Sequence, residues 1–511
     1  MTSNPSSLFP NPWAGSPPRT VLTDDLLLAY KRCDRRFFLN LRGDPRQQDP
    51  ERDFIHKLRQ ENQQQIQAFL AAETWVQPDY VPGDWERAAQ ATEALMAEGV
   101  PGLYRGLLLG AWEPTPGSPI SLLGRPTFLR RQPGRSRWGD WCYQPVNIKL
   151  GKRPKPEYKL VAALHAYLLA EVQGGPVPAP ELVLREHQSY WVDLDNWQPR
   201  LLEAIADCHQ LLAANDPPEV FISRQRCSLC RWLTACQTEA REQQHLSLVP
   251  GVTPSRYEDL RRLGVNTLAD LAHLEPWQAA AVLTPEAASQ LQAQAQALLA
   301  GQAFLRPDRR SCYHQPLPQG RIELYFDVEA EPDRNVDFLL GVLVVNHRTG
   351  TERFHAFLAE TPAEEALIWQ QFLALLLRYP EAPIFHFSAY EVETVQRLAT
   401  LYKTAQVPLP QVLSRFVDLH AWVTQSAVLP VENYSLKTLA KWLGFAWRDA
   451  EASGDQTVCW YDRWLRQGDR QLLEAIVRYN EDDCRATYRL KQWLEAFLAS
   501  AAPPPPLAVN A

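Results

Sequence analysis

The pattern of apolar and polar positions divides the chain into an N-terminal stretch, a helical middle and a C-terminal stretch. In the N-terminal stretch, residues 102–150 contain short apolar runs separated by glycine and proline, such as SLLGRPTFLRR. This alternation predicts several strands joined by turns, with a further strand signal at Glu181–Asp193. Four helices are predicted around these strands: Asp24–Asn40, Asp53–Thr74, Glu157–Gln173 and Asn196–Ala213.

The middle of the chain carries helical patterns. Leu248–Leu271 predicts two short helices, and Asn266 is a suitable N-cap for the second. Pro276–Gly301 is rich in alanine and glutamine and predicts a longer helix. Arg306–Gln319 contains proline and glycine and has no periodic pattern of apolar residues, which indicates a linker.

The C-terminal stretch begins with strand signals and ends with helices. The predicted elements are strands at Arg321–Phe326, Phe338–Asn346 and Glu352–Leu358, a helix at Pro362–Tyr379, a strand at Pro383–Phe387, a helix at Glu391–Tyr402, and further helices to about Ser500. Three consecutive strands followed by alternating strand and helix indicate a mixed sheet with helices packed on it. The chain is therefore predicted to be a multidomain α/β protein, with tails at 1–21 and 501–511.

Composition narrows the class of protein. Of the 511 residues, 45% are hydrophobic and 22% charged, which excludes a wholly disordered chain. The net charge of −7 excludes a global basic field, so a nucleic-acid partner would need a local basic surface. The longest apolar run, Phe338–Val345, is too short to span a bilayer, and the N-terminus lacks the features of a signal peptide. We therefore expect a cytoplasmic protein without a membrane partner.

Acidic residues stand at one predicted strand end and at one predicted helix start. Asp327 and Glu329 are two residues apart, so on a strand they share a face and could bind one divalent cation. The alternative is a pair of exposed acids at a strand end. Glu391 opens a helix after a strand, where the helix N-terminus favours a carboxylate in any case.

A third set lies in the sequence RYNEDDCRATYRL near the C-terminus. Tyr479 and Asp483 are four residues apart and share one face of a helix. Asp482 is predicted to pair with Arg478 by the same spacing. The alternative for Tyr479 is a core residue with its hydroxyl at the surface.

Together these three sets resemble the DnaQ-like (DEDD) 3′–5′ exonucleases of the ribonuclease H-like superfamily, in the DEDDy branch. The resemblance covers about 306–500, and FVDLHAWVTQ…YSLKTLAKWLGFAWRD is similar to the exonuclease domain of YprB-type proteins. It implies that Asp327, Glu329, Glu391 and Asp483 bind Mg²⁺ or Mn²⁺ and that Tyr479 orients or deprotonates water. Glu391 departs from the family, in which most members have Asp.

The nine cysteines are an odd number for a disulfide framework and direct attention to metal. Cys227, Cys230 and Cys236 lie within ten residues, and Cys33 is the candidate for a remote fourth ligand. This arrangement resembles the iron–sulfur staple of RecB-family nucleases, which implies a [4Fe–4S] cluster. The alternative is structural zinc on the same four thiols.

By the same resemblance, the segment between these cysteines is a PD-(D/E)XK nuclease domain with a restriction-endonuclease fold. Thr127 and Asn147 stand where active relatives have acids, while Lys149 is retained. Neutral residues bind divalent metal weakly, so we expect a catalytically impaired domain. Lys149, Lys152 and Arg153 could still bind DNA; the alternative is a solvated surface turn.

The middle stretch resembles helix–hairpin–helix units, in which Gly251 and Gly264 would bring backbone N–H groups to phosphates. The expected domains are RecB-like (22–245), helix–hairpin–helix with connector (246–305) and DnaQ-like (306–500). This order predicts a metal-dependent 3′–5′ exonuclease acting on DNA, with a helicase or repair protein as a further partner. The alternatives are an RNA exonuclease and a non-catalytic DNA-binding scaffold in repair.

Overall fold

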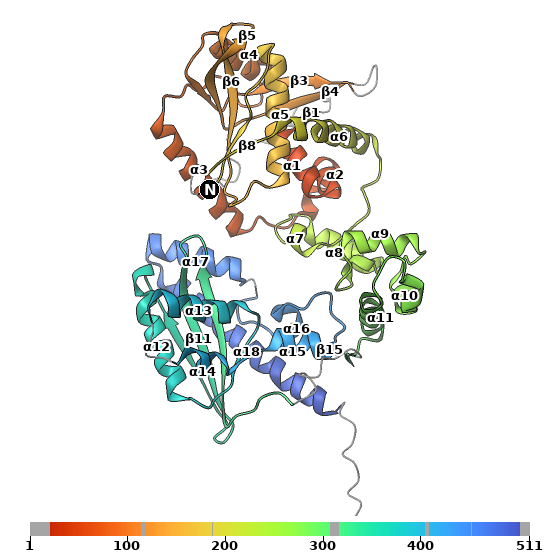
Figure 1. Cartoon of the computed structure of the whole chain (residues 1–511), viewed down its shortest axis with the longest axis vertical. Coiled ribbons are helices and arrows are strands. Elements are labelled where there is room, and N and C mark those ends of the chain that lie inside the picture. Colours follow the sequence, from red (N-terminus) through yellow and green to blue (C-terminus); the bar gives the residue numbers. More distant parts are fainter. Residues whose placement is uncertain are drawn as a thin grey trace, which may run out of the picture. The chain divides into compact units, whose positions relative to one another are not determined.

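The computed structural model describes residues 21–113, 119–185, 188–306, 316–403, 408–450 and 452–500. The chain divides into two compact units, Met1–Thr238 and Glu239–Ala511 (Figure 1). The predicted tails, apart from Val21, lie outside the described residues, as does most of the predicted linker (307–315).

The first unit contains the several strands that the sequence pattern predicts, and they form two sheets. The larger has the order β2-β5-β6-β7-β8 and the smaller the order β1-β4-β3. The strands are β1 (Val21–Thr23), β2 (Gly102–Tyr104), β3 (Leu108–Trp112), β4 (Ile120–Gly124), β5 (Phe128–Ser136), β6 (Gly139–Ile148), β7 (Glu181–Val183) and β8 (Ser189–Trp191). The apolar helix α5 (Pro156–Gln173) packs against β3, β4 and β6 and forms the centre of the core.

The helix predicted over Asp24–Asn40 is two helices, because the chain is extended at Cys33. Here φ is −168° and ψ is 121°, and the Cys33 Sγ accepts a hydrogen bond from the Arg36 N–H at 3.4 Å. The break therefore presents the thiol between two helix ends. The helices of this unit are α1 (Asp24–Arg32), α2 (Asp34–Arg42), α3 (Asp53–Ala72), α4 (Trp85–Ala97), α6 (Leu194–Ala213), α7 (Arg224–Cys227) and α8 (Leu233–Glu242).

The second unit begins with the helical middle stretch: α9 (Pro254–Arg262), α10 (Leu268–Ala272) and α11 (Pro285–Ala300). The N-cap of α10 is Thr267 and not Asn266, because Thr267 and Asp270 form a reciprocal capping box. The helix predicted from Pro276 begins nine residues later, where Thr284 caps Pro285. Pro276–Ala279 is instead a separate 3₁₀ turn.

A five-stranded mixed sheet with the order β12-β11-β10-β13-β14 organises the rest of the second unit. Its strands are β10 (Ile322–Glu331), β11 (Val336–Asn346), β12 (Thr351–Leu358), β13 (Ile384–His386) and β14 (Phe416–Asp418). β10, β11 and β12 are antiparallel, whereas β10, β13 and β14 are parallel. This confirms the predicted mixed sheet.

Helices cover both faces of this sheet, as expected. Leu324 and Phe326 point into one core with α12 (Glu365–Arg378) and α13 (Tyr390–Leu401), whereas the alternate residue Tyr325 points into the other. The second core is closed by α15 (Leu419–Ser426), α16 (Leu436–Trp442) and the long α18 (Arg470–Ser500). The remaining elements are α14 (Leu409–Leu413), α17 (Gly454–Gln467) and the pair β9 (Phe304–Leu305) and β15 (Ala427–Val428).

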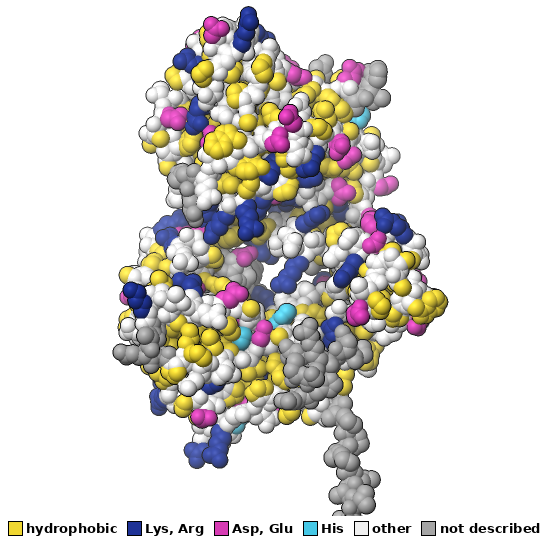
Figure 2. All heavy atoms as spheres, viewed as in Figure 1, with side chains coloured by type: hydrophobic (Ala, Val, Ile, Leu, Met, Phe, Trp, Pro, Cys, Tyr) yellow, Lys and Arg dark blue, Asp and Glu magenta, His cyan; other side chains and the backbone are white. Residues whose placement is uncertain are grey.

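The distribution of charged side chains on the surface is consistent with the modest net charge. On the face shown in Figure 2, basic, acidic and apolar side chains are interspersed over each unit. None of the helices in the described part of the chain combines the length and apolar character that a membrane span needs.

Candidate active site

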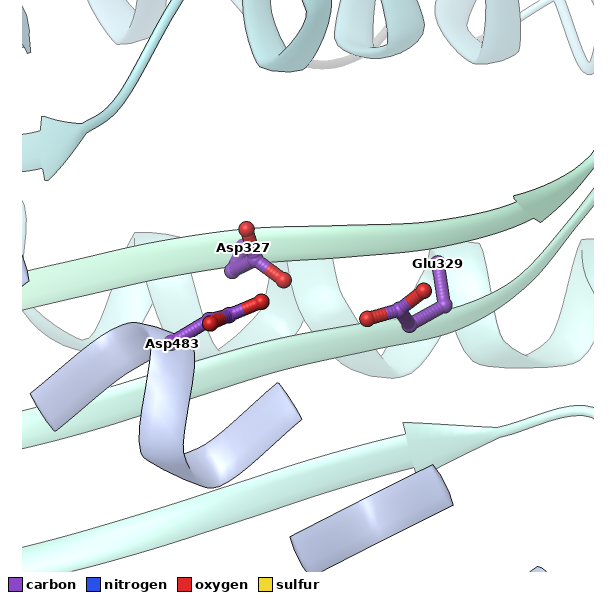
Figure 3. A group of neighbouring side chains, drawn as sticks. All are labelled: Asp327, Glu329 and Asp483. Atoms are coloured by element: carbon purple, nitrogen blue, oxygen red, sulfur yellow. The ribbon is translucent and has the colours of Figure 1, made fainter. Parts of the chain in front are cut away.

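Three of the predicted acids meet on one face of the mixed sheet. Ligand oxygens of Asp327, Glu329 and Asp483 all lie within 4.8 Å of one another. Asp327 and Glu329 come from β10, and Asp483 lies midway along α18, which packs on β10 and β11. Figure 3 shows these carboxylates directed toward one another. The sheet thus joins residues more than 150 positions apart in the sequence.

A glycine in the sheet lets α18 approach this closely. Gly341 on β11 pairs with Asp327 in the register. A Cβ atom at Gly341 would lie 1.6 Å from the Oδ1 of Asn480 on α18, a distance that no side chain tolerates. Because Gly341 has no side chain, α18 can pack close to the sheet, and this close packing brings Asp483 to β10.

Glu391 lies in the first turn of α13 and is buried, with 4% of its surface exposed. Its Oε2 accepts a hydrogen bond from the Ser388 Oγ at 3.0 Å and is 3.6 Å from the Nδ1 of His386. Glu391 is not among the three acids within 4.8 Å, but its charge contributes to raising the pKa of Asp327. It is therefore the fourth acid of the same electrostatic site.

The pKa values of the three clustered acids are raised. Burial, followed by the charges of Asp483, Glu329 and Glu391, raises the pKa of Asp327 well above its ordinary value. Burial and the charge of Asp483 raise the pKa of Glu329 to about 8. Burial raises the pKa of Asp483 to about 7 despite its neutral hydrogen-bond donors. The site thus concentrates negative charge that a cation would relieve.

Tyr479 lies one helical turn before Asp483 and is 8% exposed. Burial and the neighbouring Asp483 carboxylate raise the pKa of the Tyr479 phenol, so the phenol and this carboxylate interact electrostatically. The ring also packs with Ala440, Trp447 and Ala486. Tyr479 therefore belongs both to a small core cluster and to the acidic site.

The acids fit divalent cations such as Mg²⁺ or Mn²⁺. All offered ligand atoms are carboxylate oxygens, the hard ligands that these ions prefer. Burial, followed by mutual repulsion, raises the pKa values of Asp327 and Glu329, and a bound cation would favour the charged form of both carboxylates. Asp327, Glu329 and Asp483 would hold such an ion, with Glu391 beside them.

The sequence did not indicate three residues that contact the clustered acids Asp327, Glu329 and Asp483. The Asn480 Nδ2 donates to Asp327 Oδ2, the Thr457 Oγ1 donates to Glu329 Oε2 and the Trp447 Nε1 donates to Asp483 Oδ1, each at 2.7 Å. Asn480 adjoins Tyr479 in the sequence, which could have drawn attention to it. Thr457 and Trp447 carry no signal in the sequence.

One predicted ion pair is wrong. Asp482 does not pair with Arg478; it binds the backbone N–H and the side chain of Arg448 at 2.9 and 2.8 Å. Arg478 instead pairs with Asp449 at 3.1 Å. The segment that precedes α17 lies alongside α18, so a tertiary contact replaces the pairing along the helix.

The four proposed cluster ligands are near one another in the first unit. Burial raises the pKa of the Cys33 thiol, with contributions from Cys227 and Cys230, and raises that of Cys236 to about 11. All four side chains are partly exposed. In the described part of the chain, no three of these sulfur atoms lie within 4.8 Å of one another.

The positions of the impaired nuclease centre lie around β5 and β6. The Thr127 Oγ1 accepts from the Ile148 N–H at 3.2 Å, and Asn147 is buried. Lys149 is partly buried, which lowers its pKa, while Lys152 and Arg153 are exposed. The structure thus separates Lys149 from the basic turn with which it was grouped.

An unforeseen acid faces this region. Asp24 at the start of α1 is 3.4 Å from the His165 Nε2 and also binds the backbone N–H and side chain of Arg125. Burial opposes ionisation of Asp24, but His165, Arg125 and Lys149 outweigh it and lower its pKa to about 2. Lys149 therefore belongs to an internal charge network, which the sequence did not indicate.

The two predicted hairpin glycines adopt the backbone conformation that favours glycine. Gly251 has φ +95° and Gly264 has φ +81°, and both are exposed. Some nearby cations are already engaged: the Arg256 Nη1 donates to the Gly251 carbonyl at 2.8 Å, and Arg262 pairs with Asp259 at 2.9 Å.

The part of the second unit that contains the mixed sheet and its acids is similar to a known family. Residues 324–495 match the family model described as the RNase_H superfamily. The matched range extends from β10 to near the end of α18 and includes all five predicted catalytic residues. This similarity supports a nuclease-type enzyme with a nucleic-acid substrate. No curated protein matches the chain at a significant level.

Proposed function

We propose that the second unit is a metal-dependent 3′–5′ exonuclease that acts on DNA in preference to RNA. The observation that carries this proposal is the group of buried acids, Asp327, Glu329 and Asp483, with Glu391 beside them. Clustered buried acids of like charge destabilise a fold, so their presence points to a functional site, and metal-dependent phosphodiester hydrolysis requires such acids. The polarity and the preference for DNA rest on the DEDDy resemblance.

The residues have distinct roles in this reaction. Divalent ions, when bound, supply a Lewis acid and an activated water. The four acids bind these ions. Tyr479 keeps its proton at neutral pH because its pKa is raised, so its hydroxyl orients the attacking water as a neutral group. Deprotonation of water by a Tyr479 phenolate does not fit this environment.

The experiment is a nuclease assay on single-stranded DNA and RNA, labelled at either end, with Mg²⁺, Mn²⁺ or chelator. We expect mononucleotides to be released from the 3′ end of DNA only when metal is present. Asp327→Asn should abolish cleavage, since it removes one charged ligand without changing size. Full activity of Asp327→Asn would refute the assignment of this site. Cleavage of RNA alone would establish the alternative, an RNA exonuclease.

For the first unit we propose a [4Fe–4S] cluster on Cys33, Cys227, Cys230 and Cys236. The Cys33 thiol interacts electrostatically with those of Cys227 and Cys230, which supports one shared site for these thiols. Four thiolates suit a [4Fe–4S] cluster. The preference for the cluster over zinc rests on the resemblance to the iron–sulfur staple of RecB-family nucleases.

We further propose that the first unit and the hairpins bind nucleic acid without cleaving it. Thr127 and Asn147 supply no negative charge for a metal, and Lys149 is engaged with Asp24 and Asp25. Exposed Lys152 and Arg153 remain for phosphate contacts, together with the backbone at Gly251 and Gly264. A repair role and a helicase partner remain proposals by analogy.

A further inference from the structure

The four acids of the candidate active site share one kind of neighbour. Each accepts a hydrogen bond from an uncharged side chain: Asn480 to Asp327, Thr457 to Glu329 and Trp447 to Asp483 at 2.7 Å, and Ser388 to Glu391 at 3.0 Å. We call Ser388, Trp447, Thr457 and Asn480 the donor set. They come from separate places in the chain, so no single local motif explains the pattern.

Other buried acids of the same unit are bound differently. Asp337 and Glu365 both pair with Arg397 at 2.6 Å. Glu323 pairs with Lys491 at 3.0 Å. A cationic partner neutralises a carboxylate and competes with a metal ion for it, whereas a neutral donor orients the carboxylate and leaves its charge. The donor set therefore orients the active-site acids without giving them a cationic partner that a metal ion would have to displace.

Asn480 is held in place beside Asp327. Its Nδ2 donates to the Asp327 Oδ2 at 2.7 Å. The residue is fully buried, and its Oδ1 occupies the space left by Gly341. An amide fixed in this way restricts the orientation of the Asp327 carboxylate on β10.

Ser388 shows the strain that accompanies such positioning. Its φ of +132° is a conformation that L-residues rarely adopt. The Ser388 Oγ donates to Glu391 and accepts from the Tyr390 N–H at 3.2 Å. Strain of this kind persists at functional sites because the surrounding contacts hold it. Here the strained residue directs the first turn of α13 and with it Glu391.

We propose that the donor set consists of positioning residues that hold the four acids for divalent-cation binding. Each donor uses one lone pair of one carboxylate oxygen. The remaining lone pairs of that carboxylate stay available to the metal ion. This inference rests on the proposed metal-dependent nuclease and adds the residues that set its metal affinity. Removal of one such neutral partner typically lowers metal affinity or activity about 10–100-fold.

The test is a titration of the full-length protein with Mn²⁺. The concentration of free Mn²⁺ is measured at each step by electron paramagnetic resonance and gives the affinity. Thr457→Val is nearly isosteric and removes the donor, whereas Thr457→Ser keeps it. We expect Thr457→Val to weaken Mn²⁺ binding about 10–100-fold and Thr457→Ser to bind nearly as well as wild type. Equal affinity in all three proteins, with unchanged melting temperatures, would overturn the proposal.

A second pair of variants keeps the proposal testable if Thr457→Val does not fold. Trp447→Phe removes the indole N–H beside Asp483, and Trp442→Phe is its control, since Trp442 packs with Trp493. Only Trp447→Phe should weaken Mn²⁺ binding. If wild type binds Mn²⁺ but cleaves no nucleic acid, the nuclease proposal fails and the donor set is judged by affinity alone. If wild type binds no Mn²⁺, both proposals fail.

Discussion

Asp482 and Asp483 are neighbours on α18 but have opposite partners. Asp482 binds the Arg448 guanidinium at 2.8 Å, while Asp483 accepts from the neutral Trp447 indole at 2.7 Å. Both carboxylates are buried, with 4% and 9% of their surface exposed. Only the second has a hydrogen-bond partner that carries no positive charge to compete with a metal ion. Partner chemistry, not burial, separates the structural acid from the proposed catalytic one.

Tyr479→Phe should lower the cleavage rate by about 10²–10⁴-fold, the usual contribution of a group that positions or transfers a proton. The ring still packs with Trp447, so the melting temperature should change little. Steady-state kinetics with end-labelled DNA gives the rate, and Tyr461→Phe, which alters a buried hydroxyl bound to the Ala359 carbonyl, is the control. An unchanged rate would make Tyr479 a core residue only.

Gly341→Ala should impair activity without touching an acid. The added Cβ would meet the Asn480 Oδ1 and force α18 away from β10. Overpacking of this kind costs about 1–3 kcal/mol, measurable by denaturant unfolding. Gly454→Ala is the control, because its Cβ would meet no atom within 4 Å. Equal stability and activity of the two variants would contradict the role given to Gly341.

The metal-free protein should lose stability as pH rises. The pKa of Glu329 is raised to about 8 and that of Asp483 to about 7, so the native state keeps protons that the unfolded chain has released. A native state that binds more protons is destabilised by increasing pH, here between the ordinary carboxyl range and about pH 8. Mn²⁺ displaces these protons, so its affinity should rise over the same window.

Thermal unfolding in chelator from about pH 5 to about pH 9 measures this dependence. Glu329→Gln carries no proton to lose, so its stability should fall less steeply. Saturating Mn²⁺ should flatten the wild-type curve. Stability that increases with pH in chelator would contradict the raised pKa values.

Anaerobically purified protein should be brown and contain about four iron and four sulfide per chain. Cys230→Ser should lose the colour and destabilise the first unit, because the cluster would join α2 to α7 and α8. Cys142→Ser is the control: that thiol lies 3.8 Å from the Pro133 carbonyl, which a hydroxyl can also contact. Colourless protein with stoichiometric zinc would favour the zinc alternative.

Lys149→Ala should change turnover little at saturating substrate. Lys149 interacts electrostatically with Asp24 and Asp25. Positions 127 and 147 carry Thr and Asn in place of metal-binding acids, so Lys149 has no metal site beside it there. The variant is compared with Asp327→Asn in one nuclease assay. If Lys149→Ala abolishes cleavage and Asp327→Asn does not, the active centre is in the first unit.

The sequence alone determined the mixed sheet and the spacing of its acids. The apolar and aromatic runs of β10 and β11 and the helical spacing in α12 and α13 are local properties, so these elements follow from local sequence. Asp327-x-Glu329 and Tyr479-x3-Asp483 also follow from local spacing, because two residues on a strand and four on a helix share a face.

The tertiary structure alone decided which acids lie together and which partners they have. The approach of Asp483 to Asp327 depends on Gly341 and the depth of α18, and the donors Trp447 and Thr457 come from distant segments. The electrostatic interaction between Asp24 and Lys149 likewise depends on the tertiary structure, because the two residues are more than 100 positions apart in the sequence. Hydrogen bonds and charge interactions act over a few ångströms in space, whatever the separation along the chain, so local patterns cannot specify them.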